Sequence, residues 1–392
     1  MAKKILIFSL AYYPHFVSGA EAAIKEITDR IDPSDIIFHM VTHLFDMSAP
    51  RNERIGNVRV HRVGFGNAYL SKILFIPLAA LKARALHRTH RFSALWAMMT
   101  YMLFPTVLTR TIGVAVPHIL TLQDGDPYER VFTRKCIKPF VPILDYGFRT
   151  AACIQVISTY LATWPPKRGY KGEVVLIHNG ANPRDVQGEC KREEIAALKR
   201  TLGKKEGDIF LVNTARLVHQ KAYDVTIQAL KFLPEHIKFI VVGGGDEEKK
   251  LKNLAKNLDL EKRIVFVGKV DRSVVSHYRQ ASDIFVGPSR SEGLGNAFLS
   301  AMASRLPVVA TQEGGIADFL FDKKHNPDKE PTGWVVDKDN PTQIAEAVQD
   351  ILAHPETTKV ITERARAMVL RSFNWDMVAQ DMRERFFGKA LS

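Results

Sequence analysis

Short apolar runs alternate with longer segments of helical periodicity along most of the chain. Ile5 to Leu10 is a continuous apolar run, as expected for a strand buried in a parallel sheet. A helical pattern follows from Ala20 to Ile31. Further strand-like runs occupy residues 36–42, 58–63, 94–99, 118–122, 154–158 and 174–177. Strands that alternate with helices at this spacing predict βαβ units in an α/β fold with a parallel sheet.

The same alternation begins again after a polar, charged stretch from Pro183 to Asp208. Strands are expected at residues 209–213, 239–242, 264–267, 283–286, 307–310 and 333–336, with helices at residues 296–304 and 341–353. The sequence therefore predicts two α/β domains, residues 1–183 and residues 184–370. A C-terminal helical segment around Trp375, in residues 371–392, follows them.

The stretch from Pro288 to Thr311 places an acid and two glycines between a strand and a helix. Its loop is expected at the carboxyl edge of the sheet, where such folds bind ligands. The backbone N–H groups of Leu294, Gly295 and Asn296 are expected to lack partners at the helix start, which favours an anion such as phosphate. The Glu292 carboxylate is an acceptor suited to hydroxyl groups. Together these groups predict a ligand with both hydroxyls and phosphate, such as a nucleotide sugar.

The chain is strongly basic and poor in cysteine. Its 392 residues include 55 Lys and Arg against 42 Asp and Glu, which gives a net charge of +13 at pH 7. This excess favours phosphorylated ligands, anionic lipid or nucleic acid as partners. The cysteines have no metal-type spacing and indicate a reduced, cytoplasmic protein. The first residues have no evident cleavage site, so we expect a strand there and not a signal peptide.

Cations are interleaved with apolar residues from Tyr69 to Arg91. They are Lys72, Lys82, Arg84, Arg88 and Arg91. This composition suits an amphipathic helix on an anionic membrane, or a surface helix that covers the sheet with solvated cations. Pro77 is expected to start or kink this helix. Residues 128–149 form a second basic segment, and residues 92–109 approach transmembrane length, although we expect a strand and a proline-broken helix there.

The Glu292 stretch resembles a pattern of retaining GT-B glycosyltransferases of family 4. That pattern is a glutamate, seven residues, a second glutamate, a small-residue helix and a Pro-Val-Val strand. Glu292 matches the first glutamate, and Ser300 stands at the place of the second. The resemblance implies two Rossmann-like domains facing a central cleft, with the C-terminal helix crossing back to the first domain. It also implies that Glu292 orients sugar hydroxyls or a phosphate edge, and that Ser300 contacts the nucleotide ribose.

Further residues match the family at strand ends. Arg216 and Lys221 follow the strand at residues 209–213 with the family's Arg-x4-Lys spacing, and the resemblance implies that they stabilise a departing diphosphate. Gly19, Gly243 and Val270 fall at positions that approach the donor in the family.

The family often carries a histidine followed by an acid after the strand at residues 118–122, and this chain has Gln123 and Asp124 there. Glutamine cannot act as a general base, so we expect Gln123 to position the sugar or the acceptor, with Asp124 beside it. The turn from His178 to Asn182 resembles an Asn-Gly turn that precedes the family's domain linker.

The resemblance implies a retaining, metal-independent hexosyltransferase. The expected donor is a UDP- or GDP-linked sugar, with no other cofactor, and the expected acceptor is a glycan or lipid-linked molecule in cell-envelope or polysaccharide synthesis. A cytoplasmic protein, peripheral on the inner face of the cell membrane, would suit such an acceptor. No nucleic acid is expected as a partner, since no recognised binding module is present.

Two alternatives remain open. One is a GT-B sugar-nucleotide epimerase, which would need acid–base residues. The other is a basic membrane- or nucleic-acid-binding protein whose catalytic site has decayed, an interpretation motivated by Ser18, Gln123 and Ser300.

Overall fold

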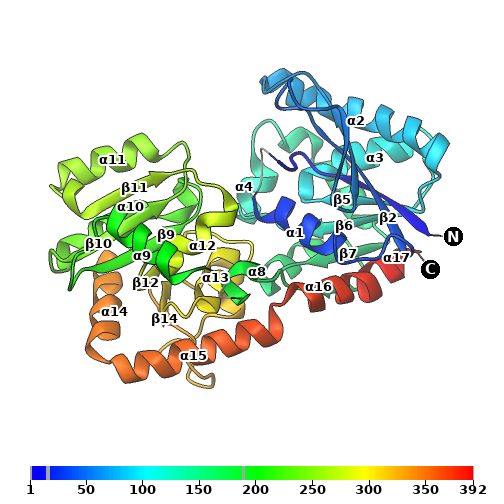
Figure 1. Ribbon diagram of the computed structural model, residues 1–392. Coiled ribbons are helices and arrows are strands. Elements are labelled where there is room, and N and C mark those ends of the chain that lie inside the picture. Colours follow the sequence, from blue (N-terminus) through cyan, green and yellow to red (C-terminus); the bar gives the residue numbers. More distant parts are fainter. Residues whose placement is uncertain (1, 15–17, 188–189, 392) are drawn as a thin grey trace. The chain divides into compact units, whose positions relative to one another are not determined.

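The computed structural model consists of two compact α/β units, each built on a mainly parallel sheet (Figure 1). The structure describes residues 2–14, 18–187 and 190–391. The first unit contains Met1–Asn179 and Trp375–Ser392, and the second contains Gly180–Asn374. Residues 15–17, which precede the first helix in the sequence, lie outside the described residues. This arrangement confirms the predicted fold class, two Rossmann-like units with a C-terminal helix that returns to the first of them.

The first unit's sheet has the strand order β3-β4-β2-β1-β5-β6-β7-β8. Its strands are β1 Lys3–Phe8, β2 Ile36–His43, β3 Asn52–Ile55, β4 Val58–Val63, β5 Ala94–Met98, β6 His118–Leu122, β7 Cys153–Val156 and β8 Val174–Leu176. β3 pairs antiparallel with β4, whereas the other neighbours are parallel. β3 was not predicted, because an edge strand with no fully buried position has no apolar run to mark it.

Helices cover both faces of this sheet. They are α1 Gly19–Thr28, α2 Tyr69–His90, α3 Leu103–Thr111, α4 Tyr128–Thr133, α5 Val141–Arg149, α6 Thr159–Ala162, α7 Trp164–Lys167, α16 Trp375–Asp381 and α17 Gly388–Leu391. α3 contacts both α2 and α5, so these three form one layer, while α1 packs beside α16 (Figure 1).

The C-terminal segment completes the core of the first unit. A short π-helical stretch, Met382–Phe387, joins α16 to α17. The Phe387 ring lies 5.7 Å from that of Phe38 and 5.0 Å from that of Trp96, measured between centroids. Because Trp96 and Phe387 are fully buried, removing this segment would expose the centre of the core.

The second unit's sheet is parallel throughout, in the order β11-β10-β9-β12-β13-β14. Its strands are β9 Ile209–Thr214, β10 Ile237–Val242, β11 Ile264–Gly268, β12 Ile284–Gly287, β13 Val308–Ala310 and β14 Trp334–Val335. Its helices are α8 Pro183–Gln187, α9 Arg192–Thr201, α10 Tyr223–Ala229, α11 Glu248–Asn257, α12 Val275–Gln280, α13 Asn296–Ala303, α14 Pro341–Ala353 and α15 Pro355–Ser372. The strand order reverses between β9 and β12, which makes a topological switch point there.

One prediction about proline was wrong, and one of the two alternatives for Pro77, a start or a kink of the helix, is excluded. α2 runs from Tyr69 to His90 with Pro77 inside it, so this proline does not start the helix. α3 contains Pro105 in its first turn, where the missing N–H would have had no helical partner, so the helix is not broken. Residues 94–111 thus form a strand and a short helix, and in the described part of the chain no helix is both long enough and apolar enough to cross a bilayer.

Candidate active site

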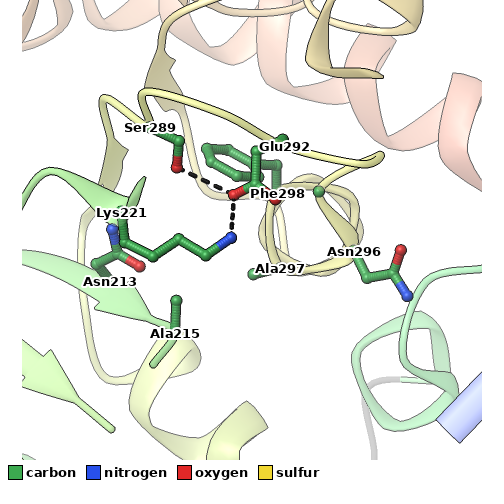
Figure 2. Close-up of a pocket in the computed structure, with 9 residues that line it drawn as sticks. Asn213, Ala215, Lys221, Ser289, Glu292, Asn296, Ala297 and Phe298 are labelled. Carbon is green, nitrogen blue, oxygen red and sulfur yellow. Dashed lines mark hydrogen bonds and ion pairs between the residues drawn. The ribbon is translucent and has the colours of Figure 1, made fainter. Parts of the chain in front are cut away.

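A pocket opens at the switch point of the second unit's sheet (Figure 2). Residues from the end of β9 and the turn after it line one side, and residues from the loop after β12 and the start of α13 line the other. They are Asn213, Ala215, Lys221, Ser289, Glu292, Gly295, Asn296, Ala297 and Phe298. The two crossovers that begin at β9 and β12 lead to opposite sides of the sheet, so a crevice forms where they separate.

An ion pair between Lys221 and Glu292 crosses this pocket. Lys221 Nζ donates a hydrogen bond to Glu292 Oε1, and Ser289 Oγ donates to the same oxygen at 3.0 Å (Figure 2). The Glu292 side chain is only 7% exposed and that of Lys221 is 19% exposed. Among the described residues Glu292 Oε2 accepts no hydrogen bond, so the carboxylate has capacity left for a ligand hydroxyl.

Arg290 joins the two loops that carry this pair. Its guanidinium donates to Asp224 at 2.7 and 3.0 Å, to Asp339 at 2.7 Å and to the His219 carbonyl at 2.8 Å. Its backbone N–H donates to the Gln220 carbonyl at 2.7 Å. Arg290 therefore fixes the turn before Lys221 against the loop before Glu292. This role was not predicted from the sequence, because the partners of Arg290 are distant along the chain.

Two glycines allow backbone segments to approach closely around the pocket. Gly314 has φ +64°, and a Cβ there would lie 2.0 Å from the Glu292 carbonyl oxygen. Gly243 has φ +146°, and a Cβ there would lie 2.1 Å from the Ala215 carbonyl oxygen. Since no other residue fits either place without movement, these glycines hold the Glu292 loop and the Arg216 loop in position.

The start of α13 supplies backbone donors to the same pocket. Gly295 is the N-cap, with φ +103°, and Asn296 and Ala297 form the first helical positions along the pocket wall. Their N–H groups have no acceptor within the helix, so this end suits an anionic ligand. Of the three predicted donors, Gly295 and Asn296 line the pocket, whereas Leu294 does not and is only 1% exposed.

Ser300 does not line the pocket. Its hydroxyl donates to the Asn296 carbonyl at 2.8 Å, one turn earlier in α13, and accepts from the Asn182 N–H at 3.1 Å. The donor and one of the two acceptor lone pairs of the hydroxyl therefore serve the protein's own backbone. A ribose contact of Ser300 would have to use the second lone pair or replace one of these bonds.

The remaining residues expected near a donor are distributed over three loops. Arg216 is exposed in the turn after β9, and its guanidinium forms neither a hydrogen bond nor an ion pair with any described residue, while its carbonyl accepts from the Val218 N–H at 3.0 Å. Val270 is half-buried in the loop after β11. Gly19 begins α1 in the first unit, directly after the N-cap Ser18, whose backbone N–H bonds to Glu21.

Gln123 and Asp124 lie buried at the end of β6 in the first unit. Gln123 and Asn179 exchange two amide hydrogen bonds, of 3.0 and 3.3 Å. Asp124 accepts from the Thr100 hydroxyl at 3.0 Å and from its N–H at 3.3 Å. Burial raises the pKa of the Asp124 carboxyl to about 6, although the bonds from Thr100 oppose this. Gln123 is thus an amide held in place beside a carboxyl whose pKa is raised by burial.

Within residues 2–14, 18–187 and 190–391, no cluster of three or more His, Cys, Asp or Glu side chains has the geometry to hold a metal ion.

Residues 194–368 match the protein family described as Glycosyl transferases group 1. An uncharacterized glycosyltransferase of Methanocaldococcus jannaschii is 30% identical over 212 residues, which are 53% of this chain and 52% of that protein. A second from the same organism is 24% identical over 97% of both chains. A GDP-mannose-dependent alpha-(1-6)-phosphatidylinositol monomannoside mannosyltransferase of Mycolicibacterium smegmatis is 30% identical over 42% of this chain and 44% of its own length. The chain therefore spans about half the length of two of these three relatives.

Solved structures share the fold over almost the whole chain. Sucrose-phosphate synthase from Thermosynechococcus elongatus has a TM-score of 0.84 at 18% identity and covers 98% of both chains. Anabaena HepE in complex with UDP-glucose has a TM-score of 0.79 at 20% identity, over 98% of this chain and 99% of its own. The fold of the chain is thus the GT-B fold.

Proposed function

We propose that this chain, a relative of the group 1 glycosyl transferases, moves a hexosyl group from a nucleotide sugar to an acceptor hydroxyl with retention of anomeric configuration. The observation that carries the proposal is the pocket at the switch point of the second unit. It combines a carboxylate, Glu292, with a cation, Lys221, and the free amides at the start of α13. A sugar presents hydroxyls to the first of these groups, and a diphosphate presents anionic oxygens to the others.

Lys221 can serve both partners at once. An ammonium group has three N–H donors, and Glu292 takes one of them, so two are left for phosphate oxygens. Arg216 adds a planar guanidinium that can bind two oxygens of one phosphate group. Negative charge develops on the diphosphate as the sugar leaves, so both cations and the α13 amides stabilise the transition state more than the ground state.

Retention fits the polar content of the pocket. Glu292 is the one carboxylate among the residues lining it, and its Oε1 is already bonded to Lys221 and Ser289. A retaining glycosidase places two carboxyl groups on either side of the bond that breaks, one of them as nucleophile. In our proposal Glu292 instead orients sugar hydroxyls, and the reaction proceeds without a covalent sugar–protein intermediate and without a metal ion.

The donor we propose is UDP- or GDP-linked. Relatives and structural neighbours include a protein named as GDP-mannose-dependent and one bound to UDP-glucose. The acceptor we propose is a glycan or a lipid-linked molecule at the cytoplasmic face of the cell membrane. Gln123 and Asp124 in the first unit are our candidates for its polar contacts, since both are held in fixed positions at a strand end.

Binding of UDP and GDP to Arg216→Ala tests the assignment of the diphosphate site. Loss of a charge-assisted contact is expected to weaken the better nucleotide by about 1.5–3 kcal/mol, a factor of about ten or more. Isothermal titration calorimetry measures the affinity. Arg200→Ala, which removes an exposed cation on α9, is the matched control and should bind as the wild type does. Equal affinities of all three proteins would remove Arg216 from the site.

A further inference from the structure

α2 has two faces of different character. One side of the helix packs on the sheet, and its residues Phe75, Ala79 and Ala83 are buried. The opposite side presents large apolar side chains that are between 36% and 58% exposed, namely Leu70, Ile73, Leu74, Leu78 and Leu81. Their spacing of three and four residues aligns them in one stripe along the N-terminal half of the helix.

The same stripe becomes cationic in the C-terminal half of α2. Arg84 and Arg88 continue the spacing from Leu81, and both are exposed. Neither guanidinium group forms an ion pair or hydrogen bond with any residue that the structure describes. The whole helix contains no Asp or Glu, so nothing on it neutralises these charges. The helix therefore presents an apolar half followed by a basic half to the same side.

A neighbouring segment has the same composition. Lys138–Phe140 forms a short 3-10 turn that leads into α5, and α5 contacts α3, which also contacts α2. This segment exposes Phe140, Ile143 and Tyr146, which are 39% to 52% exposed. It also exposes the cations Lys138 and Arg149, and Lys135 is exposed just before it. Large apolar and basic side chains thus occur together on two helices of one layer.

We propose that the stripe of α2, with the exposed residues of the Lys138–Arg149 segment, is a docking face for an anionic lipid bilayer. Single exposed apolar residues are common on protein surfaces. An aligned row of them, beside cations that have no acidic partner, suits a bilayer, which has an apolar interior and, with anionic lipids, a negatively charged surface. The apolar half of α2 would enter the boundary of the acyl chains. Arg84 and Arg88 would remain at the level of the lipid phosphates.

This docking face is independent of the chemistry proposed for the second unit. It lies entirely in the first unit, and binding to vesicles needs neither a donor nor an acceptor. A protein that binds vesicles but transfers no sugar would refute the proposed function alone, and an active transferase that ignores vesicles would refute the docking face alone.

Flotation of the full chain with vesicles tests the proposal. Vesicles of phosphatidylcholine with about one-third phosphatidylglycerol should carry the protein to the top of a gradient at low salt. Leu70→Ser/Ile73→Ser/Leu81→Ser should bind at least about ten-fold more weakly, because three apolar side chains no longer leave water. Leu352→Ser/Val360→Ser/Met377→Ser removes the same kind of side chain from other exposed places and should bind like the wild type.

A second pair of variants separates charge from apolar contact. Arg84→Gln/Arg88→Gln should weaken binding to anionic vesicles by about thirty-fold, since each cation near such a surface contributes a factor of about five. Lys249→Gln/Lys256→Gln lowers the net charge equally, from exposed positions on α11, and should have little effect.

High salt should weaken wild-type binding. Wild-type protein that stays at the bottom of the gradient, or an apolar triple variant that floats like the wild type, would overturn the proposal. If both pairs of variants weakened vesicle binding equally, binding would depend on net charge alone, and the proposal would be overturned as well.

Discussion

Glu292→Gln is expected to lower sugar transfer by about 10²-fold or more while the protein stays folded. Glutamine has almost the same shape, and its amide oxygen can still accept from Lys221 and Ser289. What it loses is the negative charge, which strengthens hydrogen bonds to sugar hydroxyls and balances Lys221 in a poorly hydrated pocket. Initial rates of nucleoside diphosphate release from the preferred donor, with a thermal melt beside them, measure both effects.

Glu363→Gln is the control for this change. Glu363 forms an ion pair with Arg305 at 2.8 Å, but both side chains are more than half exposed. Exposed pairs contribute little to stability, and this one lies outside the residues that line the pocket, so wild-type rates are expected. Glu292→Gln with the same rate as Glu363→Gln would show that the carboxylate has no part in transfer.

Gly314→Ala is expected to lower the stability of the second unit and its affinity for the nucleotide together. An alanine there keeps φ +64° only with strain, and its Cβ would lie 2.0 Å from the Glu292 carbonyl oxygen. That oxygen belongs to backbone and cannot rotate away, so the Glu292 loop has to move. We expect a loss of about 3 kcal/mol or more, seen as a lower midpoint of thermal unfolding, with weaker binding of UDP or GDP.

Gly203→Ala isolates the steric part of this effect. Gly203 also has a left-handed backbone, φ +71°, and a Cβ there would meet nothing within 4 Å. This variant should show only the cost of the backbone conformation, about 1–2 kcal/mol, and normal nucleotide binding. If Gly314→Ala and Gly203→Ala were equally stable and bound nucleotide equally well, the close packing of Gly314 on the Glu292 loop would have no functional role.

The fold could be predicted from the sequence because buried parallel strands are continuous apolar runs. β9, β10 and β12 were all recognised in this way, and their ends define the pocket. β3 was missed because its residues are half-buried or exposed, so its pattern is that of a loop. Pro77 was expected to start or kink its helix, and the start is excluded because α2 already begins at Tyr69.

Residues of the candidate site could be predicted from the sequence only where their position after a strand end implied their chemistry. Glu292 and Lys221 follow strand ends at the switch point, and the structure brings them into direct contact. The packing role of Gly314 and the bridges of Arg290 depend on partners distant in the chain, so spacing carried no sign of them. The ribose contact of Ser300 stays a prediction, and the bonds of its hydroxyl to the Asn182 and Asn296 backbone could not be foreseen from spacing.

Incubation of the purified chain with UDP- and GDP-linked sugars, followed by proton NMR, tests the central claim most directly. A glycosyltransferase without its acceptor transfers sugar slowly to water, so the experiment needs no knowledge of the acceptor. We predict that at least one α-linked donor releases its nucleoside diphosphate and that the free sugar appears first as the α-anomer. Arg216→Ala and Glu292→Gln should suppress this release. First appearance of the β-anomer would contradict retention, and a donor returned as its epimer would indicate an epimerase. No release from any donor would contradict the proposed function.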